Sequence, residues 1–109
     1  MSNEAWDDRI FKALGSATRR EILDALKDRP RTTGFLCARF PALDRCTVMQ
    51  HLKVLEEAGL VVARREGRVR WNHLDALPIK RLHDRWIGPY AERAVTVLDR
   101  LRADLEEKG

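Results

Sequence analysis

Residues 45–58 read RCTVMQHLKVLEEA, and their spacing predicts a helix with two different faces. Val48, Leu52 and Leu55 recur at the interval that places apolar side chains on one side of a helix. Side chains that form hydrogen bonds, such as Gln50, fall on the opposite side. A helix that is anchored on one face and carries donors and acceptors on the other suits the major groove of DNA.

The residues around this segment predict where the helix begins and ends. Asp44 can cap its first turn, and Gly59 follows its last turn as a C-terminal stop. Before it, residues 33–40 form a short amphipathic helix, and residues 41–44 form a tight connection. A short helix, a turn of about four residues and a longer helix together indicate a helix-turn-helix.

After the helix, residues 60–66 and 69–74 have the composition of two strands on either side of Glu66-Gly67, which suits a hairpin turn. Between residues 64 and 70 there are four arginines and one glutamate, a net charge of +3. A basic hairpin beside a helix-turn-helix defines a winged helix. Because side chains alternate along a strand, we expect two or three of these arginines to contact phosphates or the minor groove. The candidates are Arg64, Arg65, Arg68 and Arg70.

The two ends of the chain carry apolar stripes that a small core cannot absorb. Residues 4–14 predict one helix, and residues 75–107 predict a second helical stretch that is interrupted at Gly88-Pro89. We interpret the stripes as an isologous homodimer interface, with an intramolecular antiparallel helix pair as the alternative. The side chains expected in this interface are Trp6, Ile10, Trp86, Tyr90, Val97, Leu98, Leu101 and Leu105.

A further helix is predicted for residues 17–27, with Ser16 as its cap, and residues 31–32 can add a short strand. Arg19 and Arg20 near the start of this helix are weaker candidates for the DNA backbone. Surface salt bridges with acidic neighbours on the same helix are an equally good explanation for these two arginines.

The whole chain sets bounds on the class of protein. Its 109 residues suit one domain, which we interpret as a winged helix-turn-helix over residues 1–109, mainly α with a small β-hairpin wing. Residues 16–74 form the DNA-binding core and wing, and residues 1–14 and 75–109 form the dimerisation helices. The net charge is +4, and arginine supplies most of the positive charge, which favours a nucleic-acid partner. Without a membrane-length apolar run or a signal-peptide core, we expect a soluble cytoplasmic protein.

The DNA contacts follow from a recognition helix that enters the groove with its N-terminus first. Gln50 has a donor and an acceptor suited to adenine, and the Thr47 methyl group can meet that of thymine. Arg45 can take a guanine or a phosphate, whereas His51 suits a phosphate or a structural hydrogen bond. Lys53 suits the DNA backbone. The alternative, a merely solvated helix face, is disfavoured by the basic hairpin next to it.

The chain resembles the ArsR/SmtB family of bacterial winged-helix repressors. The matching segments are FKALGSATRREILDAL at 11–26 and TVMQHLKVLEEAGLVVARREGRVRWNHL at 47–74. The ending PIKRLHDRWIGPYAERAVTVLDRL at 78–101 is similar to a branch without metal sites, whose last helix carries spaced aromatics. The resemblance implies a homodimer with a helix from each end of the chain in the interface. It also implies a short inverted-repeat operator on double-stranded DNA.

The metal sites of that family do not match this chain. In TTGFLC at 32–37, Thr32 and Gly34 stand where ligands would be expected, and Cys37 lies further on, where we expect it to be buried. His83 and Asp84 have no later histidine to complete a site. We therefore expect no metal and no other cofactor.

Two residues leave regulatory questions open. Cys46 is expected to be exposed at a helix N-terminus beside Arg45, which favours the thiolate and a thiol-based redox role. The simpler interpretation is a small residue in place of a serine. Phe35 could contact the partner's last helix or border a small-molecule pocket, and the effector, if one exists, is not identified.

Two other classes of function compete with DNA binding. An enzyme is disfavoured, because no catalytic triad, carboxylate pair, phosphate loop or cofactor motif stands out. A winged-helix protein-interaction module without DNA binding would be supported by an acidic wing, whereas this wing is basic. The sequence therefore favours a DNA-binding transcriptional regulator, expected to act as a repressor.

Overall fold

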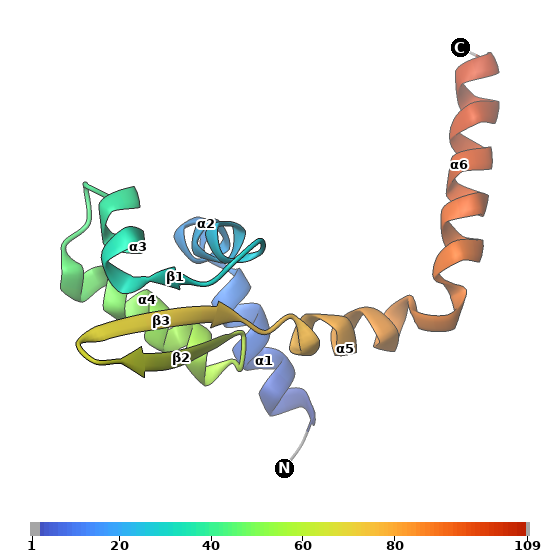
Figure 1. Ribbon diagram of the computed structural model, residues 1–109. Helices are drawn as coiled ribbons and strands as arrows, with labels where there is room; N and C mark the ends of the chain where they lie inside the picture. Colours follow the sequence, from blue (N-terminus) through green and yellow to red (C-terminus); the bar gives the residue numbers. More distant parts are fainter. Residues whose placement is uncertain (1–2, 109) are drawn as a thin grey trace. The chain divides into compact units, whose positions relative to one another are not determined.

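A computed structural model describes residues 3–108 (Figure 1), excluding the side chains of six of them (residues 3, 89, 91, 92, 94 and 108). It divides into two compact units, one ending at Ile79 and the other beginning at Lys80. The elements are α1 (Asn3–Leu14), α2 (Ala17–Leu26), β1 (Arg31–Thr32), α3 (Thr33–Arg39), α4 (Arg45–Glu57), β2 (Val61–Glu66), β3 (Val69–Leu74), α5 (Leu77–Trp86), the short 3₁₀ helix η1 (Gly88–Tyr90) and α6 (Ala91–Lys108). Helix α5 crosses the boundary between the units. The predicted fold class, mainly helical with a small hairpin, is confirmed.

Each of three helices begins at a side chain that accepts a hydrogen bond from the backbone. Ser16 accepts from the N–H of Arg19 at 3.3 Å, and Thr32 accepts from that of Phe35 at 3.1 Å. Asp44 accepts from the N–H of Thr47 at 2.7 Å. Such caps each contribute about 1 kcal/mol, because they satisfy donors that the helix leaves unpaired. The caps predicted at Ser16 and Asp44 are confirmed.

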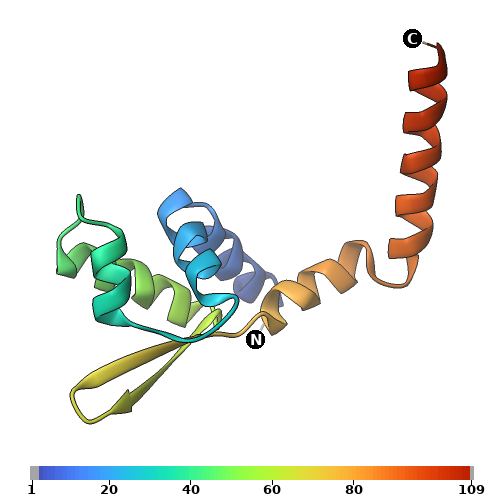
Figure 2. The ribbon, with the colours of Figure 1, turned by 45° about the horizontal axis from the view of Figure 1, so that its top comes forward.

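The strands form one antiparallel sheet in the order β1-β3-β2. The predicted two-residue strand is present and pairs Arg31 with Asn72. In the hairpin, Glu66 pairs with Val69, so the loop consists of Gly67 and Arg68 alone. Gly67 has a φ of 63°, which glycine adopts without strain, and this turn places Arg68 at the hairpin tip. Figure 2 shows the hairpin projecting away from the helices.

The core of the first unit surrounds α4, which packs against α1, α2, α3 and β2. The predicted inner faces are buried, and each large aliphatic side chain contributes about 1.5–3 kcal/mol when fully buried. Residues of this core include Ile10, Ala13, Ile22, Leu23, Leu26, Leu36, Val48, Leu52, Leu55 and Leu60.

Ile10 belongs to this core, which corrects one expectation about the subunit interface. Its side chain is only 4% exposed in the single chain, so it has almost no surface left for a partner. The neighbouring Trp6 and Phe11 are 39% and 48% exposed. These two aromatic side chains are therefore the large apolar groups that α1 presents to its surroundings.

The second unit is built around α6. The predicted interruption at Gly88-Pro89 is confirmed as η1, and Gly88 has a φ of 29°. Along α6 the large apolar side chains remain more than half exposed, namely Val95, Val97, Leu98, Leu101 and Leu105. No helix among the described residues is both long and apolar enough to cross a membrane.

Candidate nucleic-acid interface

Besides its buried face, helix α4 has an outer side, a side toward α1 and α2, and a side toward the wing. Successive residues turn by about 100°, so residues three or four positions apart share a side. Cys46, Gln50 and Lys53 lie on the outer side and are all exposed. Asp44 lies at the start of the helix, and the hydrogen bond from the Thr47 N–H lowers the pKa of its carboxyl. The outer side therefore presents an amide, a thiol and an ammonium group to the surroundings.

The side of α4 that faces α1 and α2 is held by an arginine. Arg19 lies 3.2 Å from Nδ1 of His51, and the same guanidinium donates to the carbonyl oxygens of Lys12 at 2.7 Å and Ala13 at 2.8 Å. Arg20 donates to the carbonyl of Leu14 at 2.6 Å. Both arginines thus cap the end of α1, a role that neither sequence-based explanation included. His51 makes the structural hydrogen bond that was one of its two expected roles.

The environment of His51 disfavours its charged form. Partial burial lowers the pKa of its imidazole, and the positive charge of Arg19 lowers it further. A neutral Nδ1 can accept the hydrogen bond from Arg19, whereas a protonated ring cannot. The contact between α2 and α4 is therefore strongest when His51 is neutral.

We expect this histidine to make stability depend on pH. Its contribution is fully present above the ordinary histidine pKa of about 6.5. As the pH falls from there toward the lower folded-state pKa, the unfolded chain binds the proton first, and the free energy of unfolding decreases. Urea denaturation from pH 7.5 to 5.5 should therefore show a smaller loss of stability in His51→Gln than in the native protein. Equal losses in the two proteins would contradict this assignment.

The wing arginines lie on two different faces of the hairpin. Arg65 pairs with Arg70 in the strand register, so these two side chains share one face. Arg64 pairs with Trp71 one position further on, so it lies on the opposite face. Arg64 and Arg65 are exposed, and so is Arg68 at the tip. The four arginines therefore do not form a single cluster.

Arg70 is engaged inside the protein, which corrects its expected role as a phosphate contact. Its guanidinium forms an ion pair with Glu56 at the end of α4, and its side chain is only 18% exposed. Its Nε also donates to Oδ1 of Asn72 at 3.2 Å. A charge that is already neutralised by a carboxylate has little attraction left for phosphate. The pair instead joins the wing to α4, and it offsets the repulsion between Arg70 and Arg65 across the strands.

Asn72 connects the wing to α3 from a fully buried position. Its amide nitrogen donates to the carbonyl of Arg31 at 3.2 Å and to the hydroxyl of Thr33 at 3.1 Å. Its amide oxygen accepts the hydrogen bond from Arg70, so this one side chain links β1, α3 and β3. Neither Asn72 nor Glu56 was predicted, because these contacts join residues far apart in the sequence.

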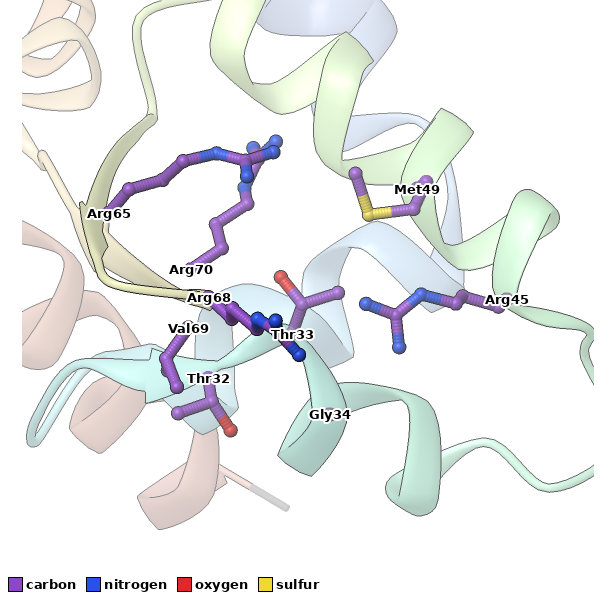
Figure 3. A pocket seen from close by; sticks show the side chains of 9 residues that line it. All are labelled: Thr32, Thr33, Gly34, Arg45, Met49, Arg65, Arg68, Val69 and Arg70. Carbon is purple, nitrogen blue, oxygen red and sulfur yellow. The ribbon is translucent and has the colours of Figure 1, made fainter.

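A groove of about 500 Å³ lies between the wing, the start of α4 and the start of α3. Arg45 enters it from α4 and Arg65 and Arg68 enter it from the wing, as Figure 3 shows. Met49, which shares the wing-facing side of α4 with Arg45, lies on the wall between them. The other residues that line the groove are Thr32, Thr33, Gly34, Val69 and Arg70.

The two candidate regulatory residues lie on different helices, Phe35 on α3 and Cys46 on α4. Cys46 is exposed as predicted, whereas Cys37 is only half-buried and not fully buried as expected. The ring of Phe35 is 42% exposed and is stacked by Arg31, whose guanidinium carbon lies 4.4 Å from the ring centre. Within residues 3–108, the structure brings together no group of three or more histidine, cysteine or acidic side chains that could hold a metal.

The fold and the arrangement of polar and basic side chains define a winged helix-turn-helix protein. A helix-turn-helix domain model matches residues 14–64. The HTH-type transcriptional regulator YuzN of Bacillus subtilis is 41% identical over 86 residues, which are 73% of this chain and 94% of that protein. The transcriptional repressor SdpR of the same organism is 33% identical over 61 residues, which are 56% of this chain and 67% of that protein.

Solved structures agree with this assignment. An ArsR-like transcriptional regulator from Rhodococcus sp. RHA1 superimposes with a TM-score of 0.70 at 26% identity. The match covers 98% of this chain and 94% of the Rhodococcus chain. The chain belongs to the ArsR-like family of winged helix-turn-helix transcriptional regulators. It is a DNA-binding transcriptional regulator.

Proposed function

We propose that the protein represses transcription by binding an inverted-repeat operator as a homodimer. The observation that carries this proposal is the exposed polar side of α4, which lies next to a groove and a hairpin tip lined with arginines. In such an arrangement α4 enters the major groove while the wing follows the adjacent DNA backbone. The similarity to the repressor SdpR supports repression as the outcome.

Gln50 and Thr47 are our candidates for direct base contacts. Gln50 lies in the middle of the outer side of α4, where its amide can pair with the donor and acceptor of adenine. Thr47 lies on the flank and is partly exposed, and we assign its methyl group to contact with a thymine methyl. Lys53 and Arg64 are exposed and suit the phosphates, whereas His51 is already occupied by Arg19. Base contacts select a sequence, and phosphate contacts position the protein.

Replacing Gln50 by alanine should reduce operator affinity by about 1–3 kcal/mol and relax the preference at one base step in each half-site. The reason is that the amide supplies sequence-dependent hydrogen bonds. Affinities for the operator and for its single-base variants, measured by fluorescence anisotropy, would reveal this change. Lys53→Ala is the matched comparison on the same side of α4, and it should weaken all sequences by the same factor. Equal losses on operator and random DNA in Gln50→Ala would refute a base contact.

The homodimer is supported by the apolar surfaces at the two ends of the chain. Trp6 and Phe11 on α1 are exposed, and so are Tyr90 and the large apolar side chains of α6 that the structure describes. Trp86 is 59% exposed as well. Large apolar patches are rarely left exposed to solvent in monomeric proteins, and where they occur they usually mark an interaction site. A second copy of the chain would bury them symmetrically.

Selection of bound DNA from a random pool tests the whole proposal. We expect a palindromic consensus with half-site centres about one helical turn apart, and binding that weakens steeply with salt. A consensus without symmetry would reject the homodimer. Absence of salt-dependent DNA binding would instead favour a protein-interaction module. A reporter gene with the selected site at its promoter would then distinguish repression from activation.

A further inference from the structure

One arginine of α2, Arg19, joins α1 to the recognition helix through three different nitrogen atoms. Its Nε donates to the carbonyl of Ala13 at 2.8 Å, and one terminal nitrogen donates to that of Lys12 at 2.7 Å. The other terminal nitrogen lies 3.2 Å from Nδ1 of His51 on α4. The guanidinium is planar and rigid, so the two bonds to the end of α1 fix where the third bond to α4 is made.

The protonation state of His51 decides whether this third bond exists. A guanidinium donates hydrogen bonds and accepts none, so Nδ1 must be the acceptor and the ring proton must lie on Nε2. A second proton on Nδ1 would remove the acceptor and place two positive charges side by side. The bond between Arg19 and His51 therefore requires a neutral imidazole.

The surroundings of the imidazole contain little that would stabilise its charged form. Helix α4 packs against α1, α2, α3 and β2. Among the described residues of these elements, partial burial and the charge of Arg19 are what lower the pKa of His51, and no carboxylate raises it. The residues one turn away on α4 itself are uncharged. Mild acid therefore breaks the bond without a replacement partner for the ring.

His51 lies beside the proposed base contacts on α4. It follows Gln50 directly, and it comes one turn after Thr47, so it shares a flank of the helix with that residue. The buried face of α4 is apolar, and the hydrophobic effect that holds it has no directional requirement. The hydrogen bond from Arg19 does have a direction. It therefore constrains the rotation of α4 about its own axis.

We propose that Arg19 is a positioning residue for base recognition, which acts through neutral His51 and holds Thr47 and Gln50 in register with the base edges. Protonation of His51 releases this hold, so the protein discriminates less well between operator and random DNA in mild acid. The inference rests on the DNA-binding function proposed above and adds a pair of residues that controls specificity from within the protein. Because an added positive charge attracts every DNA sequence, the effect lies in the ratio of the two affinities.

The ratio of the dissociation constants for random and operator DNA tests the inference. Fluorescence anisotropy measures both constants at pH 7.5 and 5.5 and at constant ionic strength. In the native protein the ratio should fall by about threefold for each half-site at pH 5.5, because an ordinary histidine pKa of about 6.5 would set a limit near tenfold. The lowered pKa of His51 makes the loss smaller than that limit. Circular dichroism at both pH values checks that the protein stays folded.

Two variants at residue 51 separate positioning from packing. The amide oxygen of asparagine stands near the place of Nδ1 and does not titrate, so His51→Asn should keep a high ratio at both pH values. His51→Ala has no acceptor, so its ratio at pH 7.5 should be at least as low as the native ratio at pH 5.5. A merely structural role of this side chain would instead weaken binding to operator and random DNA by the same factor.

His73→Asn and His83→Asn are the matched controls. The chain has three histidines, and these two lie on β3 and α5. Both variants keep the bond between Arg19 and His51, so their ratios should fall at pH 5.5 as the native ratio does.

Three results would overturn the inference. The first is an equal ratio at both pH values in the native protein, or the same decrease in His51→Asn, and this comparison decides the question even if His51→Ala does not fold. The second is a native ratio in folded His51→Ala at pH 7.5. The third is disappearance of the pH effect in His73→Asn or His83→Asn. Absence of sequence-specific binding by the native protein at pH 7.5 would reject the proposed function itself, and the inference with it.

Discussion

Replacing Leu101 by glutamate should separate the protein into monomers and reduce operator affinity by about a hundredfold or more, the scale on which two linked binding sites exceed one. Leu101 is 53% exposed in the middle of the apolar row of α6. A carboxylate there would have to be desolvated without a partner if a second copy covered this row. Sedimentation velocity would measure the oligomeric state, and fluorescence anisotropy would measure the affinity.

Ala103→Glu is the matched control for this experiment. It introduces the same carboxylate into the same helix, but two residues further on, on the side of α6 away from Leu98 and Leu101. It should leave both the oligomeric state and the affinity unchanged. Native behaviour of Leu101→Glu in both assays would show that the row of α6 does not form the interface. Far-ultraviolet circular dichroism checks that both variants keep their helix.

Replacing Asn72 by alanine should reduce the free energy of unfolding by about 3 kcal/mol. The side chain is fully buried, and its loss would leave the carbonyl of Arg31 and the hydroxyl of Thr33 without their donor. An unpaired buried polar group costs about 1–3 kcal/mol, and a small cavity adds to that. The expected loss is a large part of the 5–15 kcal/mol that keeps typical domains folded. Urea denaturation at pH 7.5 measures it.

Two comparison variants separate the hydrogen-bond network from general effects on β3. His73→Ala removes a side chain from the next position on the strand, and it should cost less than about 1 kcal/mol. Thr33→Val removes one partner of Asn72, so the double variant should lose less than the sum of the two single losses. Additive losses would show that the buried amide and hydroxyl do not act together.

Local patterns predicted the elements well, because helix faces and caps depend on residues within a few positions. The apolar spacing of Val48, Leu52 and Leu55 identified the buried side of α4. The side chain of Asp44 identified its start, and Gly59, with a φ of 74°, follows its end. The interruption before α6 was also predicted, because the break depends on Gly88 and Pro89 themselves and not on distant residues.

These local patterns could not predict contacts between residues that are far apart in the sequence. Ile10 was assigned to a subunit interface, because its spacing places it on the apolar face of the helix but does not show which part of the protein covers that face. Arg70 was assigned to DNA, because its partner Glu56 lies 14 residues away on another element. The pairing depends on the strand register and on how the hairpin lies against α4.

The sequence by itself determined that this protein is a winged helix-turn-helix with a polar recognition helix and a basic hairpin, since each of these features is a local pattern. Only the tertiary structure decided which arginines remain free. The strand register separates Arg64 from Arg65, and the ion pair with Glu56 neutralises Arg70. Packing of the wing beside α4 brings Arg45 and Arg68 to one groove. Charge is a property of the residue, but its availability depends on what the fold places beside it.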